Sequence, residues 1–320
     1  VLTIESALLE WLTDDEVSLV LIDAEGEKAF CAGGDVAMLY QQGAAGDTAS
    51  GCQFWRDEYR LNALIDSYPK PYVAIMDGIV MGGGIGISAH GSHRIVTERS
   101  TLALPECSIG LVPDVGSTHL LARAPGHIGE YLGLTGERFN ASDALFTGFA
   151  DFHVPVARLD DLKHALVQSG DVNVIEEFQE STTRSTLADR RPDIDSVFGA
   201  ATIRDVMGKL SDIDSELTRS AAKRMCASSP MSLMLTFDLI RESRSTPGLA
   251  LALVREYRFV SRSMEYADIL EGVRAAIIDK DRDPQWKYPS MTVVPPDLIS
   301  WLQGEAPGGD PVFHSQQTES

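Results

Sequence analysis

Short apolar runs alternate with glycine-containing turns and helical patterns in the first half of the chain, and this alternation stops near Val156. Runs of four or five residues rich in Val and Ile have the length of strands that are buried on both faces. Strands that alternate with helical segments are typical of largely parallel sheets. The sequence therefore predicts an α/β fold for the first half of the chain.

Four apolar runs in this half predict strands, and two longer segments predict amphipathic helices. The predicted strands are 18–22, 72–76, 94–97 and 101–104, and the predicted helices are 1–13 and 47–67, with a further helix beginning within 85–90. Pro69 and Pro71 end the second helix because proline cannot continue it.

The remainder of the chain is predicted to be mostly helical. Helical spacing is present in 159–166, 174–178, 213–225, 232–243, 249–263 and 269–278. We therefore expect a core over residues 1–155 and a helical region over 156–302. Residues 303–320 contain too few apolar side chains to pack, so a flexible tail is expected there.

Composition excludes several classes of function. Lys and Arg number 27 against 47 Asp and Glu, which gives a net charge of −20. Binding to nucleic acid needs clustered cations, so no nucleic-acid partner is expected, and an anionic ligand would need local dipoles and a few cations. No apolar stretch approaches the roughly 20 residues of a membrane span, so no membrane partner is expected either.

The cysteines and the common short motifs exclude further classes. Four cysteines, Cys31, Cys52, Cys107 and Cys226, lie far apart without the spacing of metal ligands, so we expect reduced thiols, a cytoplasmic location and no metal site. The sequence lacks the glycine spacing of nucleoside triphosphatases and dinucleotide-binding proteins, and it lacks HExxH and GxSxG.

Two glycine-rich turns remain as candidate ligand sites. They are Gly33-Gly34 and Gly82-Gly83-Gly84, and the second lies where a helix is expected to begin. Without Cβ atoms, consecutive N–H groups can approach a ligand, and two such donors can bind a carbonyl oxygen that becomes an oxyanion. The alternative is that both segments are simply tight turns.

Two acidic residues eight positions apart, Glu106 and Asp114, lie among apolar and turn-forming neighbours. A carboxylate among such neighbours is partly desolvated, which raises its pKa, and a second carboxylate nearby can divide acid and base roles between the two. The alternative is that Glu106 caps a helix and Asp114 closes a turn.

Several segments together resemble the crotonase (enoyl-CoA hydratase/isomerase) superfamily, and within it the 3-hydroxyisobutyryl-CoA hydrolases. The superfamily resemblance lies in KAFCAGGD (28–35), KPYVAIMDG (70–78) and MGGGIG (81–86). The hydrolase resemblance lies in HGSHRIVTERSTLALPECSIGLVPDVGS (90–117), EGVRA (271–275), IDKD (278–281) and PQWK (284–287). Together these segments extend the resemblance over roughly residues 1 to 300.

The resemblance implies a spiral of ββα turns with the acyl thioester bound between two backbone donors. Carried over by position, the donors of this oxyanion hole are the N–H groups of Gly34 and Gly83. Glu106 and Asp114 match the catalytic pair of the hydrolases, and Glu58 matches a glutamate that contacts their substrate. From spacing alone, Glu58 is an ordinary solvated residue of a helix.

The resemblance also implies where coenzyme A lies. The backbone of Lys28, Ala29 and Phe30 corresponds to the adenine end of the CoA site, and the Lys28 side chain could offset part of the negative charge of the ligand. Relatives have a first strand and hairpin before the position of Val1, and this sequence does not contain them.

One departure from the superfamily pattern bears on the reaction. Hydratases of the superfamily use two glutamates to activate water, and the first of these positions is Gly86 here, so only Glu106 is acidic. We therefore expect hydrolysis of a short-chain acyl-CoA thioester, 3-hydroxyisobutyryl-CoA, to 3-hydroxyisobutyrate and CoA, as in valine catabolism. The alternatives are an enoyl-CoA hydratase or isomerase, and a noncatalytic CoA-binding protein.

The expected partners are an acyl-CoA substrate and, as in some superfamily members, further copies of the chain in a homo-oligomer. No metal or redox cofactor is expected, because CoA enters as part of the substrate. His90, His93 and His119 are interpreted as structural residues, since each lies beside a turn or an expected helix start.

Overall fold

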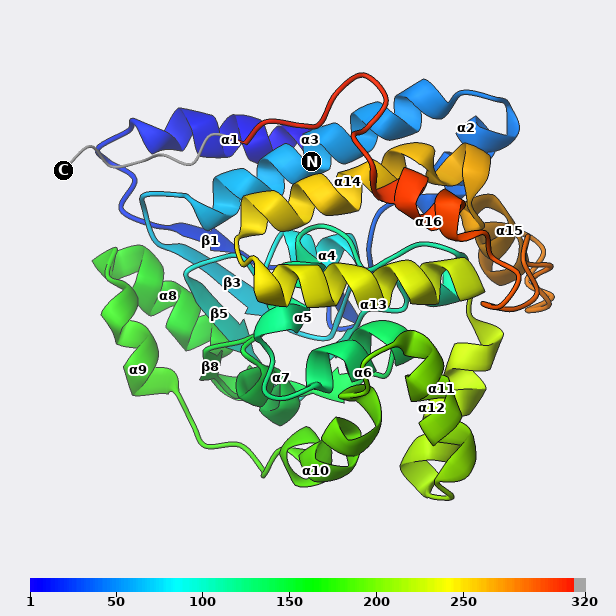
Figure 1. Cartoon of the computed structure of the whole chain (residues 1–320). Helices are drawn as coiled ribbons and strands as arrows, with labels where there is room; N and C mark the ends of the chain where they lie inside the picture. Colours follow the sequence, from blue (N-terminus) through cyan, green and yellow to red (C-terminus); the bar gives the residue numbers. More distant parts are fainter. Residues whose placement is uncertain (314–320) are drawn as a thin grey trace.

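Two small sheets set the architecture of the chain, of which the computed structural model describes residues 1–313 (Figure 1). Sheet A contains β1 (Val20–Ile22), β3 (Tyr72–Met76), β5 (His93–Val96) and β8 (Phe152–His153) in this order, and all neighbours are parallel. All five residues of β3 are buried, as expected from its uninterrupted apolar run.

Sheet B contains β2 (Ala29–Cys31), β4 (Ile79–Met81), β6 (Thr101–Ala103) and β7 (Phe139–Asn140). β2, β4 and β6 are parallel, and β7 is antiparallel to β6. Each of β1, β3 and β5 leads directly into the corresponding strand of sheet B, and helices follow. This repeat confirms the predicted α/β class with ββα turns.

Helices surround the two sheets. Up to β8 they are α1 (Leu2–Leu12), α2 (Val36–Ala44), α3 (Thr48–Asp66), α4 (Gly83–Gly86), η1 (Glu106–Ile109), α5 (Ser117–Arg123), α6 (Ile128–Thr135) and α7 (Ala141–Thr147). Beyond β8 they are η2 (Val156–Arg158), α8 (Leu159–Ser169), η3 (Val172–Val174), α9 (Ile175–Phe178), α10 (Thr186–Phe198), α11 (Ile203–Asp212), α12 (Glu216–Ala227), α13 (Pro230–Ser245), α14 (Leu249–Tyr266), α15 (Ile269–Val273), the π-helical turn η4 (Arg274–Ile278) and α16 (Pro296–Gln303).

The C-terminal helices pack directly on the spiral. α14 lies along α3, and α13 packs on α5 and α6 (Figure 1). Leu102 and Tyr131 from the first half share one buried cluster with Phe198, Phe237 and Ile240 from the second. The core therefore continues across residue 156, where the pattern changes from α/β to helical. The division into regions 1–155 and 156–302 stays a prediction.

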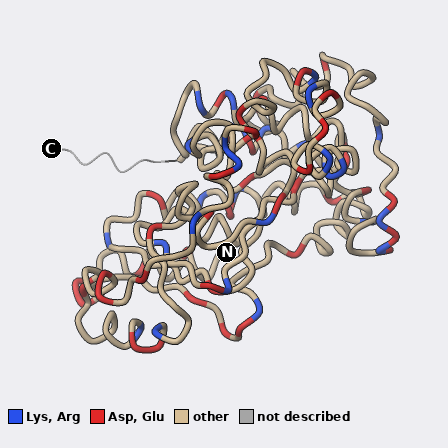
Figure 2. The backbone as a smooth tube through the Cα atoms, turned by 90° about the horizontal axis from the view of Figure 1, so that it is seen from below, with Lys and Arg blue, Asp and Glu red and all other residues tan. Residues whose placement is uncertain are grey.

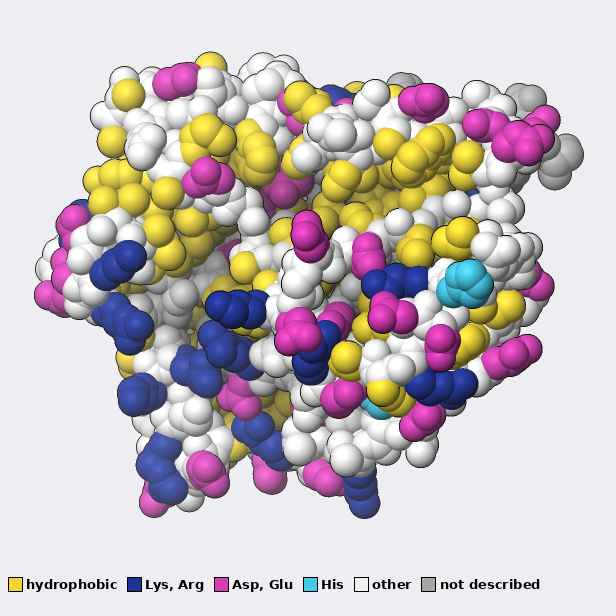
Figure 3. All heavy atoms as spheres, turned by 180° about the vertical axis from the view of Figure 1, so that it is seen from behind, with side chains coloured by type: hydrophobic (Ala, Val, Ile, Leu, Met, Phe, Trp, Pro, Cys, Tyr) yellow, Lys and Arg dark blue, Asp and Glu magenta, His cyan; other side chains and the backbone are white. Residues whose placement is uncertain are grey.

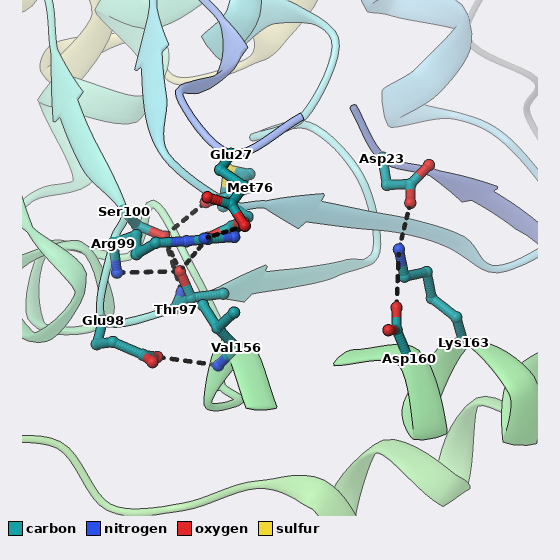
Figure 4. Close-up of polar contacts among 11 residues, drawn as sticks. Asp23, Glu27, Met76, Thr97, Glu98, Arg99, Ser100, Val156, Asp160 and Lys163 are labelled. Atoms are coloured by element: carbon teal, nitrogen blue, oxygen red, sulfur yellow. Dashed lines mark hydrogen bonds and ion pairs between the residues drawn. The ribbon is translucent and has the colours of Figure 1, made fainter. Parts of the chain in front are cut away.

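Polar contacts hold the corner where the chain leaves sheet A for sheet B (Figure 4). The Ser100 hydroxyl donates to the carbonyl of Met76 at 2.5 Å, which joins the ends of two neighbouring turns of the spiral. Lys163 on α8 donates to the Asp23 carboxylate after β1 at 2.8 Å. These bonds fix the directions in which the strands of sheet B begin.

The segment after α16 is docked, unlike the predicted tail. Arg258 pairs with Asp310 at 2.7 Å, and Arg262 donates to the carbonyl of Gly304 at 3.0 Å. Ala306 is buried. The prediction of a flexible segment is therefore wrong for residues 303–313, because two arginines of α14 supply the contacts that apolar side chains do not. Residues 314–320 lie outside the described residues.

Charged residues are spread over the whole trace. Figure 2 shows Lys and Arg interspersed with Asp and Glu, so the acidic surplus is not confined to one segment. In residues 1–313, no helix is both long enough and apolar enough to cross a membrane.

Candidate active site

Three neighbouring strands of sheet B deliver the candidate residues to one edge. β2, β4 and β6 are parallel, so their carboxyl ends lie on the same side of the sheet. β2 leads to Gly34, β4 leads to Gly83, and β6 leads to Glu106. Segments that follow the carboxyl ends of parallel strands commonly form ligand sites. The topology alone therefore brings both glycine turns and Glu106 together.

The two glycine turns are in contact. Gly33 (φ 112°) and Gly82 (φ 50°) adopt backbone conformations that favour glycine. A Cβ atom on Gly83 would lie 3.5 Å from the Gly34 nitrogen. Within residues 1–313, neither the Gly34 nor the Gly83 N–H donates a hydrogen bond to a protein acceptor. Two unused N–H groups at one place are what an oxyanion hole requires.

Glu106 begins η1, and its carboxyl group lies beside the glycine turns. Its Oε1 atom is 3.4 Å from the position that a Cβ on Gly82 would take, and the residue is only 4% exposed. Its Oε2 atom is buried and has no hydrogen-bond partner among the described residues. η1 ends at Gly110 (φ 75°), where a Cβ would meet the backbone of Asp268 at 2.4 Å.

Glu58 approaches the same turns from α3. Its Oε1 atom lies 2.8 Å from the position of a Cβ on Gly83. The residue is buried, although its spacing in the sequence is that of an ordinary helix residue. The structure therefore brings the Glu58 carboxyl beside Gly83, and its contact with a substrate stays a prediction.

Asp114 lies in the loop between η1 and α5. The Tyr59 hydroxyl donates to Asp114 Oδ2 at 2.8 Å, and both residues are buried. Because Tyr59 directly follows Glu58 on α3, one turn of this helix contacts both the carboxyl of Asp114 and the glycine turns.

Burial, and for two of them the charge of Asp114, raises the pKa values of the carboxyl groups at this site. Burial, and then the charge of Asp114, raise the pKa of Glu106 well above its ordinary value. The same two causes raise the pKa of Glu58 to about 8. Burial raises the pKa of Asp114 to about 6, and the Tyr59 hydrogen bond opposes this shift. A raised pKa makes an ionised carboxylate a stronger base.

Position 86 has no room for a side chain. A Cβ on Gly86 would lie 2.7 Å from Asn62 Nδ2 and 2.8 Å from Val115 Cβ. Asn62 is fully buried, and neither polar atom of its amide has a hydrogen-bond partner in residues 1–313. Since Asn62 lies one helical turn after Glu58, the two polar side chains lie on the same face of α3.

Lys28, Ala29 and Phe30 lie on the strand that leads to Gly34. The Lys28 side chain is exposed, and its carbonyl accepts a hydrogen bond from the N–H of Ile79 at 3.2 Å. The Phe30 side chain packs in the core. The Phe30 side chain is therefore not available to a ligand, and the role of this segment in CoA binding stays a prediction.

The structure gives the three histidines different surroundings. His90 is buried and bonds through Nε2 to the carbonyl of Val115 at 2.7 Å, and His93 bonds through Nδ1 to the Ser92 hydroxyl at 2.9 Å. His119 is half-buried, and its Nδ1 atom has no partner among the described residues. In residues 1–313, no group of three or more His, Cys, Asp and Glu side chains is arranged to hold a metal ion.

Three residues near the site are not found from the sequence pattern alone: Tyr59, Asn62 and Glu256. The sequence places Tyr59 among the apolar and aromatic residues of the predicted helix 47–67, a pattern that indicates a core residue. The signal for Asn62 is its spacing of four from Glu58 on a helix. Glu256 contacts the loop after Asp114 from 140 residues away, and no local pattern indicates such a contact.

Comparisons with known proteins identify the family of the chain. A family described as enoyl-CoA hydratase/isomerase matches residues 1–302. The chain is 38% identical to the 3-hydroxyisobutyryl-CoA hydrolase, mitochondrial, of Gallus gallus over 90% of this chain and 77% of that protein. It is 40% identical to the probable 3-hydroxyisobutyryl-CoA hydrolase 3 of Arabidopsis thaliana over 86% of this chain and 76% of that protein.

A solved structure extends the match to three dimensions. The crystal structure of an enoyl-CoA hydratase from Rhodobacter sphaeroides is 46% identical, covers 97% of this chain and 91% of its own, and superposes with a TM-score of 0.93. The family match over residues 1–302, together with the ββα spiral, is decisive. The chain belongs to the crotonase (enoyl-CoA hydratase/isomerase) family.

Proposed function

We propose that this protein hydrolyses a short-chain acyl-CoA thioester, with 3-hydroxyisobutyryl-CoA as its substrate and 3-hydroxyisobutyrate and CoA as its products, a step of valine catabolism. The observation that carries the proposal is that Glu106 is buried beside the glycine turns, whereas position 86 is a glycine whose added Cβ would lie under 3.0 Å from Asn62 and Val115. The names of the Gallus and Arabidopsis relatives support the same reaction.

Catalysis begins with the thioester carbonyl. Its oxygen accepts hydrogen bonds from the N–H groups of Gly34 and Gly83, which have no other acceptor in residues 1–313. As the carbonyl carbon becomes tetrahedral, negative charge develops on this oxygen, and each fixed donor stabilises the transition state by roughly 3–4 kcal/mol. The turns need no rearrangement for this step, because glycine already gives them the required conformation.

Glu106 supplies or activates the attacking oxygen. In one route its carboxylate removes a proton from water, whose oxygen bonds to the carbonyl carbon. In the other, Glu106 attacks the carbon directly to give a mixed anhydride that water then cleaves. In both routes the C–S bond breaks, CoA leaves as a thiolate that gains a proton, and the acyl group leaves as a carboxylate.

Asp114 and Glu58 complete the proposed machinery. Asp114, held by Tyr59, orients the water or the substrate hydroxyl and transfers a proton. Glu58 lies beside Gly83, where it can accept a hydrogen bond from the hydroxyl of the acyl group. This contact would favour hydroxylated acyl groups over plain ones.

The CoA part of the substrate lies along the backbone of Lys28, Ala29 and Phe30 in this proposal. Its phosphates need cations, and the exposed Lys28 side chain can supply one. Figure 3 shows further Lys and Arg side chains on the rear face, mixed with Asp and Glu. Hydrolysis requires only water as a second reactant, so the proposal includes no metal or redox cofactor.

Hydration of an enoyl-CoA is the second candidate, because the similar Rhodobacter protein is named an enoyl-CoA hydratase. Double-bond isomerisation is a related alternative that needs only one base. Free thiol distinguishes these reactions: hydrolysis releases CoA from 3-hydroxyisobutyryl-CoA, whereas hydration of crotonyl-CoA or isomerisation leaves the thioester intact. CoA release with no loss of the enoyl absorbance supports the proposal, and the reverse result contradicts it.

The same assay decides whether the chain is a noncatalytic CoA-binding protein, which would release no thiol from any ester in a panel of short acyl-CoA substrates. A cytoplasmic location stays a prediction, and the Gallus relative carries the word mitochondrial in its name. Assembly of a homo-oligomer also stays a prediction, which sedimentation of the purified protein tests.

A further inference from the structure

The loop that carries Asp114 contains a strained residue. Val115 has φ 53°, in the left-handed region, although its side chain is branched at Cβ. A β-branched residue in this region is a genuine outlier, and such strain persists only where surrounding contacts hold the backbone in place. The neighbours of Val115 therefore reveal what holds this loop.

Glu256, on α14, binds two of the residues that follow Val115. Its Oε2 atom accepts a hydrogen bond from the Gly116 N–H at 2.7 Å, and its Oε1 atom accepts one from the Thr118 N–H at 3.0 Å. The Thr118 hydroxyl also donates to Oε1. From the other side, His90 Nε2 donates to the carbonyl of Val115 at 2.7 Å.

Gly116 explains why the acceptor must come from another helix. It occupies the N-cap position of α5 with φ 79°, and a Cβ there would lie 2.3 Å from Leu249 Cδ1 and 2.9 Å from His90 Cε1. The cap residue therefore cannot have the side chain that usually accepts from the first turn of a helix. Glu256 accepts these hydrogen bonds instead.

A fully buried carboxyl group is costly unless it is hydrogen-bonded, so its presence in this core needs a reason. The next residue on α14, Tyr257, shows that this helix also reaches Asp114. The ring of Tyr257 packs edge-on against Tyr59, with centroids 6.2 Å apart, and Tyr59 donates to the Asp114 carboxyl. α14 thus supports the side chain of Asp114 through Tyr59, and through Glu256 it holds the backbone N–H groups of Gly116 and Thr118, which follow Asp114 in the chain.

We propose that Glu256 is a positioning residue that holds the strained turn at Val115, with the help of His90, so that Asp114 faces Glu106 and the glycine turns. The inference rests on the proposed hydrolysis. Glu256 itself does not touch the substrate, and its effect reaches the reaction through the orientation of Asp114.

The test compares the steady-state kinetics of CoA release in wild type and Glu256→Gln. Glutamine keeps the size of the side chain, but its amide NH₂ faces N–H donors and cannot accept from them. We expect kcat to fall roughly 10- to 100-fold while KM changes little, because the substrate contacts remain and Asp114 is displaced. Glu265→Gln, at an exposed position of α14, is the matched control and should retain wild-type kinetics.

Val115→Gly tests whether Glu256 acts by holding the strained turn; because this change also removes a buried side chain, V115G alone is the reference for the double variant. Glycine adopts φ 53° without strain, so the turn then depends less on Glu256. The double variant V115G/E256Q should therefore recover much of the kcat that E256Q loses. Amide hydrogen exchange at Gly116 and Thr118 should also be faster in E256Q than in wild type.

Three results would overturn the inference: wild-type kcat in folded E256Q, no recovery in the double variant, or unchanged exchange at both amides. If E256Q does not fold, Thr118→Val removes the hydroxyl that donates to Glu256 and accepts from Ser243, and unchanged kcat in that variant overturns the inference. If wild type releases no CoA, the proposed hydrolysis itself fails, and this role of Glu256 fails with it.

Discussion

Single residues decide which chemistry this site can perform. Gly86 is the residue at which the chain departs from the pattern that the resemblance implies for hydratases, and the departure is visible in the sequence. The lack of room for a side chain at position 86 is visible only in the structure, because Asn62 and Val115 come from other segments of the chain. Glu106 is identified from the sequence by its apolar neighbours and by the family resemblance, whereas Glu256 is not, since its contacts depend entirely on how α14 packs.

Replacing Gly86 with alanine should destabilise the fold. The new methyl group would lie 2.7 Å from Asn62 Nδ2 and 2.8 Å from Val115 Cβ, so the neighbours must move, at a cost of about 1–3 kcal/mol. Urea unfolding measures this cost. Gly208→Ala is the matched control: it is also in a helix, has nothing within 4 Å of its added Cβ, and should be neutral or slightly stabilising. Equal stabilities of the two variants would contradict the packing at position 86.

The pH dependence of hydrolysis should depend on Asp114. Glu106 acts in its ionised form, so kcat/KM should rise with pH through its raised pKa. Because the charge of Asp114 contributes to that rise in pKa, Asp114→Asn should move the ascending limb to lower pH while it reduces the maximum rate. An ascending limb that stays in place or moves to higher pH would show that the two carboxyl groups are not coupled.

Element boundaries follow the local sequence where one element is long or wholly apolar. The predicted strand 72–76 coincides with β3, and α3 covers all but the ends of the predicted helix 47–67, with Asp47 as its N-cap. β2 and β4 have three residues each, too few for a hydrophobic period, so their pairing in sheet B depends on the tertiary structure. These two strands place both glycine turns, so sequence patterns alone could not show that the turns meet.

The docking of the C-terminal segment on α14 gives a prediction at the scale of elements. Asp310→Asn removes the ion pair with Arg258, so residues 304–313 should detach more often and be cleaved faster by a protease. Global stability should change by less than about 1 kcal/mol, because the pair is partly exposed. Asp297→Asn, at an exposed position of α16, is the control, and equal cleavage rates would contradict the docking.

At the scale of the whole molecule, the chain tolerates four buried acidic residues around one site, although its net charge is already −20. They are Glu58, Glu106, Asp114 and Glu256. Composition predicts the acidic surface but not this interior group. The helical region after residue 156 completes the group, since α14 supplies its fourth member.

This interior group should make the fold less stable as pH rises. The pKa of Glu58 is about 8 in the folded protein, above its ordinary value, so between these two values the folded form holds a proton that the unfolded form releases. Stability is therefore lost as pH rises toward 8. Between pH 5 and pH 8, the free energy of unfolding should decrease in both proteins. The decrease should be smaller in Glu58→Gln than in wild type by at least about 1 kcal/mol, as measured by urea unfolding. Glu10→Gln, at an exposed position of α1, should behave as wild type, and identical slopes for all three proteins would contradict the burial of an ionisable Glu58.

The most direct test of the central claim is CoA release from 3-hydroxyisobutyryl-CoA by Glu106→Gln, with Glu5→Gln as a control that changes another buried glutamate outside the site. Circular dichroism confirms that both variants fold. The account predicts that Glu106→Gln lowers kcat by roughly 10²- to 10⁴-fold while Glu5→Gln stays near wild type. A folded Glu106→Gln variant that hydrolyses the thioester at the wild-type rate would contradict it.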